Sequence, residues 1–233
     1  MPRTQIRLAV FTFAIFVFQG CSSESTISAP TQVGETEFAI FDASESIQNG
    51  WRQLPLRGKT EYRLIARDGE VSIRAAGKML ASGLIRRVEL DTQACPTLQW
   101  QWRVDSLQPS ADLRVKEKED VAASIFLLFG DPGFMTNPAA VPTLRYVWTN
   151  SNHKKNEVID NPYLPGVVRS IVIRNGTTGE WMTERRNMRD DYQSAFGAPP
   201  TEMVHAVALF TDNDQTKEPV MAYYRWAKAS CSS

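Results

Sequence analysis

Apolar and polar residues alternate along most of the chain after residue 38. Residues 98–104 (LQWQWRV) alternate without interruption, so their apolar side chains share one face and Arg103 lies on the other. A period of two is typical of a strand buried on one side. The same pattern, bounded by turn residues, predicts further strands over residues 62–66, 71–75, 84–90, 144–150, 167–174, 181–186, 204–211 and 220–227.

Two segments depart from this alternation. Residues 121–129 (VAASIFLLF) are apolar on both faces, which predicts a central strand covered on each side. A single helix is predicted from Asn187 or Asp190, either of which can cap its start, to Phe196, where Gly197 ends it. About ten short strands with one brief helix predict an all-β protein, an antiparallel two-sheet β-sandwich (jelly roll).

The N-terminal segment has the pattern of an export signal. A positive start is followed by the apolar run 8–18, which is too short to span a bilayer as a permanent helix. Cys21 follows Gly20 directly and precedes a stretch rich in Ser, Thr and Pro, which predicts a lipoprotein signal peptide over residues 1–20, lipidation of Cys21 and a flexible tether over 21–36. Ordinary cleavage to a soluble periplasmic protein and an uncleaved anchor are the alternatives. A single sandwich domain is then expected over residues 37–230.

Composition narrows the classes of partner. The chain has 26 basic and 26 acidic residues and 42% hydrophobic residues, which excludes a disordered protein and a protein that coats nucleic acid. Once Cys21 is set aside, Cys95 and Cys231 remain. Export to an oxidising compartment permits them to form a disulfide, and two unpaired thiols are the alternative.

Several short strings occur in an order that resembles a bacterial family known as domain of unknown function 3047. The resemblance implies an exported jelly-roll sandwich related in shape to carbohydrate-binding modules and galactose-binding-like domains, and it implies no activity. The strings are Gly50-Trp51, 62–64 (YRL), 81–84 (ASGL), 98–104 (LQWQWRV), 146–148 (YVW), 161–163 (NPY), 183–187 (TERRN), 195–197 (AFG) and 211–214 (TDND).

The residue inventory offers little support for the common types of hydrolase. The chain has two histidines and contains no Gly-x-Ser-x-Gly elbow, glycine-rich phosphate loop or zinc-ligand spacing. Two-carboxylate chemistry remains, with Glu184 inside a predicted strand and Asp120 as its partner. An ion pair between Glu184 and a neighbouring arginine explains the same residue, and the sequence therefore favours binding over catalysis.

A ligand site is predicted on one sheet face. Alternation puts Glu184 and Arg186 on the same side of one strand, and Arg103 lies on the polar side of another. If these strands face a common groove, two guanidinium groups flank one carboxylate and bind a polar ligand. A solvated salt-bridge ladder and a filled aromatic core are the alternatives. The predicted ligand-binding residues are Arg103, Tyr146, Trp148, Glu184, Arg186, Asp212 and Asp214.

A cofactor is not expected, although one cluster could hold calcium. Asp212, Asn213 and Asp214, with Glu218 nearby, offer the hard oxygen ligands that Ca²⁺ prefers. Their spacing does not match the twelve-residue helical calcium loop. A hairpin in which Asp and Asn side chains bond their own backbone explains the same residues.

These observations predict a non-catalytic ligand-binding β-sandwich. It would be held by lipid to the bacterial cell envelope, facing the periplasm, and its ligand would be a saccharide or an envelope glycan. The alternatives are a carbohydrate-active enzyme that uses a carboxylate pair and an envelope assembly or scaffold module.

Overall fold

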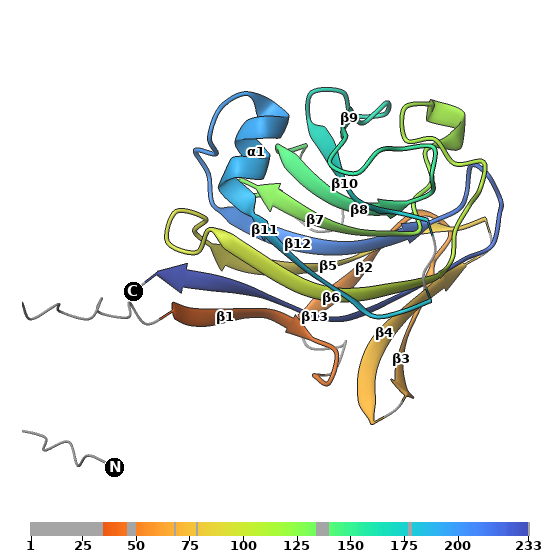
Figure 1. The fold of residues 1–233 in the computed structure, drawn as a ribbon, viewed down its shortest axis with the longest axis horizontal. Helices are drawn as coiled ribbons and strands as arrows, with labels where there is room; N and C mark the ends of the chain where they lie inside the picture. The colour runs from red at the N-terminus through yellow and green to blue at the C-terminus, as the bar shows by residue number, and fades with distance from the viewer. Residues whose placement is uncertain are drawn as a thin grey trace, which may run out of the picture. The chain divides into compact units, whose positions relative to one another are not determined.

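The computed structural model describes residues 35–45, 50–67, 69–77, 79–133, 140–176 and 179–232. The predicted signal peptide, Cys21 and most of the predicted tether lie outside these residues. The described chain forms two β-sheets, which we name sheet A and sheet B, and one α-helix (Figure 1). No helix within the described ranges combines the length and apolar character that crossing a membrane requires.

The two sheets confirm the predicted β-sandwich. All neighbouring strands are antiparallel except β8 and β10, which run parallel. Sheet A has the order β11 (Met182–Asn187), β6 (Thr97–Ser106), β13 (Val220–Ser232), β4 (Glu70–Gly77), β3 (Glu61–Arg67), with β1 (Glu35–Asp42) also paired to β13. Sheet B has the order β2 (Trp51–Arg57), β5 (Ala81–Leu90), β12 (Val204–Asp212), β7 (Ala123–Phe129), β8 (Thr143–Thr149), β10 (Val168–Asn175), β9 (Val158–Asp160).

The core lies between the facing sides of the two sheets. The alternation in β6 places Trp100 and Trp102 inward, and both are fully buried. Trp100 stacks on Tyr146 of β8 with ring centroids 5.0 Å apart, and Trp102 meets the ring of Trp148 edge-on at 5.5 Å. Tyr146 and Trp148 are therefore core residues with no exposed surface, and they do not form an open platform.

Strand β7 is central, as predicted, since it lies between β12 and β8. Its two apolar faces have different surroundings. Ile125 and Leu127 point into the core between the sheets, whereas Phe126 and Leu128 line a groove on the outer face of sheet B. On the outer face Ser124 and Leu128 are buried as predicted, and Phe126 is the one residue of β7 that is partly exposed.

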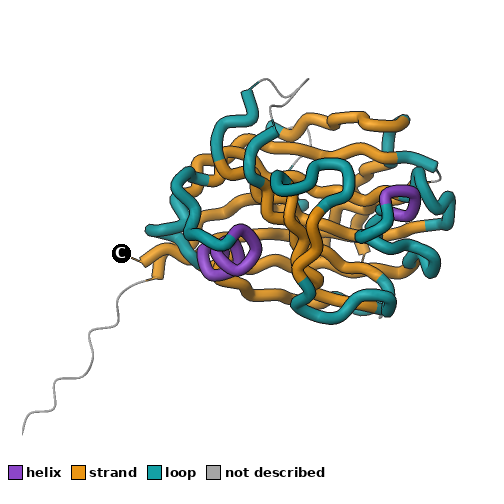
Figure 2. The backbone as a smooth tube through the Cα atoms, turned by 90° about the horizontal axis from the view of Figure 1, so that it is seen from above, coloured by secondary structure: helices purple, strands orange, loops and turns teal. Residues whose placement is uncertain are grey.

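The helix α1 (Met188–Phe196) begins and ends where the sequence indicates. The Asn187 side chain accepts hydrogen bonds from the backbone N–H groups of Arg189 and Asp190 at 3.0 and 3.2 Å, so Asn187 is the N-cap. Gly197 ends the helix with a φ of 85°, a left-handed conformation that favours glycine. Figure 2 shows α1 and the short 3-10 helix η1 (Lys116–Lys118) at opposite ends of the strands.

A disulfide joins Cys95, in the turn before β6, to Cys231 near the end of β13. The two cysteines are 136 residues apart in the sequence. The disulfide thus links the middle of the chain to its last strand, at the edge of sheet A where β1 pairs with β13.

Candidate functional site

A groove of about 950 Å³ opens on the outer face of sheet B. Its floor contains Phe126 of β7 and Phe210 of β12, whose ring centroids are 5.5 Å apart. Gly83 of β5 lies beside the Phe210 ring, where an added Cβ would come within 3.2 Å of the ring. The glycine thus allows the ring to lie against the sheet, which keeps the floor apolar and open. We call this cavity the sheet B groove.

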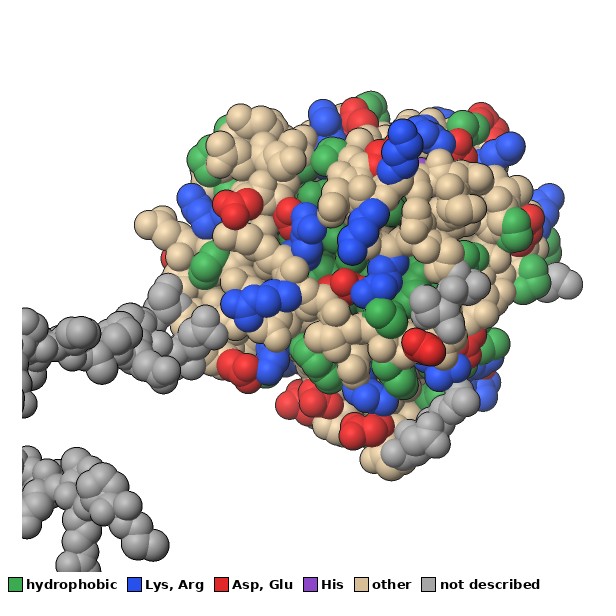
Figure 3. Space-filling view, viewed as in Figure 1, with side chains coloured by type: hydrophobic (Ala, Val, Ile, Leu, Met, Phe, Trp, Pro, Cys, Tyr) green, Lys and Arg blue, Asp and Glu red, His purple; other side chains and the backbone are tan. Residues whose placement is uncertain are grey.

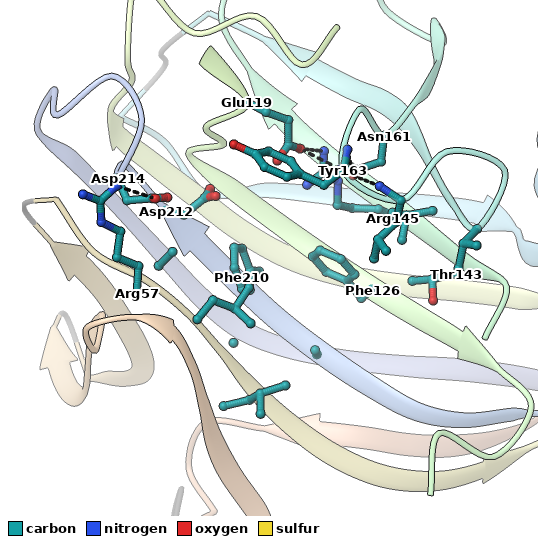
Figure 4. A pocket seen from close by; sticks show the side chains of 18 of the residues that line it. Arg57, Glu119, Phe126, Thr143, Arg145, Asn161, Tyr163, Phe210, Asp212 and Asp214 are labelled. Carbon is teal, nitrogen blue, oxygen red and sulfur yellow. Dashed lines mark hydrogen bonds and ion pairs between the residues drawn. The ribbon is translucent and has the colours of Figure 1, made fainter. Parts of the chain in front are cut away.

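One wall of the groove is formed where β12 ends. Asp212 is the last residue of β12, and Asp214 follows in the next turn. Arg57, the last residue of β2, reaches Asp214 with an Nη1 to Oδ2 distance of 3.4 Å. Figure 4 shows these three side chains on one side of the phenylalanine floor.

The opposite wall is a network around a buried ion pair. Arg145 of β8 pairs with Glu119, which also accepts a hydrogen bond of 3.0 Å from the side-chain amide of Asn161. Arg145 Nε donates to Ser170 Oγ at 2.8 Å, and the guanidinium lies over the Phe126 ring at 5.5 Å. These contacts hold the positive charge of Arg145 against the apolar floor (Figure 4).

The two walls meet through Gln215 and Tyr163. The Gln215 side-chain amide donates to Asp214 Oδ2 and to the Tyr163 hydroxyl, each at 3.2 Å. The Tyr163 hydroxyl in turn donates to the carbonyl of Lys116 at 2.8 Å. The groove therefore has one polar end with several fixed hydrogen-bonding groups, and its remaining lining is mostly apolar.

Carboxylates are concentrated at this polar end. Oxygens of Asp120, Asp212 and Asp214 lie within 4.8 Å of one another. Burial, followed by the negative charges of Glu119 and Asp120, holds the pKa of Asp212 well above its usual value. Burial also raises the pKa of Glu119, against the opposing effect of Arg145, and that of Asp214.

This carboxylate cluster differs from the predicted calcium cluster. Asn213 does not contribute, because its side chain bonds the backbone of Leu80, Gly77 and Glu218. Glu218 accepts a hydrogen bond from the backbone of Ser110. Asp120, which is distant in sequence, occupies the third position instead.

The predicted face that would unite Arg103 with Glu184 and Arg186 does not form, and that prediction is wrong. In the register of β11 with β6, Glu184 lies opposite Trp100 and therefore points toward the core. Arg103 points to the other side of sheet A, where it forms a bidentate ion pair with Asp105. The two groups cannot flank one ligand.

Glu184 and Arg186 are both engaged inside the edge of the sandwich. Glu184 pairs with Arg174 and accepts a hydrogen bond of 3.2 Å from the Trp102 indole. Arg186 pairs with Asp191 of α1 through its Nε at 2.8 Å, and Asp191 also accepts the Tyr146 hydroxyl at 2.9 Å. These contacts dock the helix and the edge strand onto the core.

Asp212 and Asp214 are the predicted site residues that line the groove. The sequence interpretation did not identify the other main groups, which are Arg57, Glu119, Phe126, Arg145, Asn161, Tyr163 and Phe210. Two features of the sequence could have indicated these residues. The second apolar face of residues 121–129 marks the floor, and the string 161–163 (NPY) lies in the loop that forms one wall.

The chain belongs to a family described as protein of unknown function (DUF3047), whose family model matches residues 49–227. This confirms the resemblance found in the sequence. No curated protein matches the chain.

Several solved structures have a similar chain trace. The K1 cleaved adhesin domain of Lys-gingipain from Porphyromonas gingivalis W83 has 9% identity and a TM-score of 0.42, over 85% of this chain and 99% of that one. A mutant of the carbohydrate-binding module CBM29-2, complexed with cellulohexaose, has 11% identity and a TM-score of 0.39, over 85% and 93%. A family 12 glycoside hydrolase has 8% identity and a TM-score of 0.44, over 84% and 100%.

Proposed function

We propose that the sheet B groove binds a saccharide of the cell envelope and that a lipid on Cys21 anchors the domain, facing the periplasm. The observation that carries this proposal is that the groove combines an aromatic floor with a polar end. A sugar ring presents an apolar C–H face and a rim of hydroxyls, so it needs both kinds of surface. Phe126 and Phe210 supply the apolar surface for the C–H face.

The polar end suits hydroxyl groups. Asp214 offers acceptor oxygens, and the Arg57 guanidinium offers several donors in a planar fork. Arg57 keeps most of its side chain exposed, so a ligand can reach it. On the face shown in Figure 3, basic and acidic side chains are interspersed, without a large patch of one sign that would favour a polyanion.

Replacing Arg57 or Tyr163 with Ala is expected to weaken glycan binding by about 5- to 30-fold, the effect of losing one or two hydrogen bonds to a bound ligand. Binding is measured by calorimetry with the glycans that the parent protein retains on an array of peptidoglycan fragments, lipopolysaccharide oligosaccharides and β-glucans.

Arg63→Ala is the matched control. Like Arg57, Arg63 is an exposed arginine in a strand and forms an ion pair with a carboxylate, but its partner is Glu61 and it lies on sheet A. Its affinity should equal that of the parent. Equal affinities in all three variants would show that the glycan binds outside the groove. If no glycan on the array binds the parent protein, the saccharide proposal is contradicted. Release of new reducing ends would instead identify a hydrolase.

Cys21→Ser is expected to remove the lipid and to release the domain from the membrane fraction. A diacylglycerol and an amide-linked acyl chain together provide the two anchors that stable attachment requires. Fractionation and intact-mass measurement of the exported protein test this prediction. A variant that stays in the membrane with the mass of the processed parent would contradict it.

A further inference from the structure

The outer face of sheet B carries more apolar surface than a sugar ring requires. In an antiparallel sheet with one face in solvent, the outward side chains are expected to be polar. The outward positions of β5, β12 and β7 instead carry Ile85, Ala208 and Leu128, which line the groove and are buried. They belong to a hydrophobic cluster separate from the sandwich core, with Leu54 and Val141 packed against it. We call these five residues the aliphatic section of the groove.

The aliphatic section continues the groove away from its polar end. Along β12, Asp212, Phe210 and Ala208 are alternate residues, so their side chains lie on one face of the sheet. Asp212 belongs to the polar end, Phe210 to the floor and Ala208 to the aliphatic section. In β5, Gly83 and Ile85 lie opposite Phe210 and Ala208, so the same order holds on the neighbouring strand. From Asp212 to Ala208 the strand rises by roughly 13 Å, and over this length the groove changes from polar to aliphatic.

Two exposed leucines lie at the rim of the groove. Leu56 of β2 is 69% exposed, and Leu164, in the loop between β9 and β10, is 45% exposed. Both line the groove, and each is next in sequence to a residue of the polar end, Arg57 or Tyr163. Large apolar side chains that remain exposed around a concave site are typical of a binding surface. Because a sugar hydroxyl forms no hydrogen bond with a leucine, a free saccharide would leave both side chains in contact with water.

We propose that the ligand of the sheet B groove is an acylated saccharide, with its sugar at the polar end and its alkyl chain over the aliphatic section. The inference rests on the saccharide binding proposed above and narrows the class of saccharide. The alkyl chain would cover the aliphatic section and the rim leucines, and each CH₂ group that it buries should tighten binding by about two- to fourfold. An extended peptide is a poorer fit, because its backbone N–H and C=O groups would be buried against side chains that cannot hydrogen-bond to them.

Alkyl glucosides of increasing chain length test the inference. The probes are hexyl, octyl and decyl β-D-glucoside below their critical micelle concentrations, with D-glucose as the probe that lacks a chain. The protein is the chain from Cys21 onward, produced without the signal peptide and therefore without lipid. Calorimetry should show one site per chain, and the Kd should fall by about 5- to 15-fold for each two CH₂ groups added.

Leu56→Gln should weaken the binding of decyl glucoside by about 5- to 20-fold, because it removes an apolar contact at the rim. The variant should unfold at nearly the same Tm as the parent, since Leu56 is largely exposed. Leu64→Gln is the matched control. Leu64 is also an exposed leucine in an edge strand, β3, but it lies on sheet A, so this variant should bind decyl glucoside as the parent does.

Equal Kd values for the three glucosides would overturn the inference, and so would a Leu56→Gln variant that binds decyl glucoside as tightly as the parent. A leucine-rich amphipathic peptide that displaces decyl glucoside and binds more tightly would assign the groove to a protein segment and would also overturn it. Failure of the proposed function is a separate result, because it is judged by the glycans that the array retains. Retained glycans together with equal affinities for the three glucosides would keep saccharide binding and remove only the acyl chain.

Discussion

Replacing both Cys95 and Cys231 with Ala is expected to lower the free energy of unfolding by about 4 to 5 kcal/mol. The disulfide closes a loop of 136 residues in the unfolded chain, and the entropy that this loop removes grows with its length. The loop spans most of both sheets, so the effect should be global and should not be confined to one edge.

Urea denaturation of the double variant and of the oxidised parent measures this difference. The parent denatured in the presence of reductant is the control, because it separates the cross-link from the loss of the two sulfur atoms. Equal midpoints for the parent with and without reductant would contradict the prediction. Intact mass after alkylation without reductant reports directly whether Cys95 and Cys231 are paired.

Strand positions could be predicted because alternation in sequence records burial on one face. In β6 the apolar residues alternate with polar ones, and every second side chain is buried. Strand β1 was not predicted, because its pairing depends on β13, which lies at the other end of the chain. Short β9 has three residues, too few to show a period.

The site was harder to predict, because it depends on which faces meet. Alternation shows that Arg103 lies on the face of its strand opposite Trp102, but it does not show that the neighbouring β11 turns Glu184 toward the core. The groove could not be predicted for the same reason, because the sequence does not show which face of a strand is left open. The apolar residue Phe126 is typical of a covered face, and only the arrangement of sheet B leaves it on an open floor. The pairing of Arg145 with Glu119 joins residues 26 positions apart and leaves no periodic signal.

Arg145→Met is expected to destabilise the domain by about 3 to 5 kcal/mol at pH 8. The Arg145 side chain is 3% exposed and the Glu119 side chain 8%, so the substitution leaves a buried carboxylate without its counter-ion. Asn161 would remain as a single hydrogen-bond donor to Glu119. Methionine is unbranched and apolar and replaces the aliphatic part of the Arg145 side chain, which limits the loss of packing.

This destabilisation should depend on pH. Burial already raises the pKa of Glu119, and Arg145 lowers it in part, so removing Arg145 raises the pKa of Glu119 further. When the folded-state pKa of a carboxyl group is raised, the group contributes its full stabilisation of the fold below its unfolded-state pKa, about 4.3 for Glu. That contribution is lost as the pH rises through the folded-state pKa. The difference between parent and variant should therefore grow from pH 5 to pH 8.

The double variant Glu119→Gln/Arg145→Met separates charge from packing. It removes both charges and keeps an acceptor for the Asn161 amide, so it should recover most of the stability that Arg145→Met loses at pH 8. Denaturation curves of the parent and both variants at pH 5 and pH 8 provide the comparison. If the single and double variants are equally unstable at pH 5 and at pH 8, then Glu119 does not become an unpaired buried charge. The loss of stability would then arise from the lost contacts of Arg145 with Ser170 and Phe126.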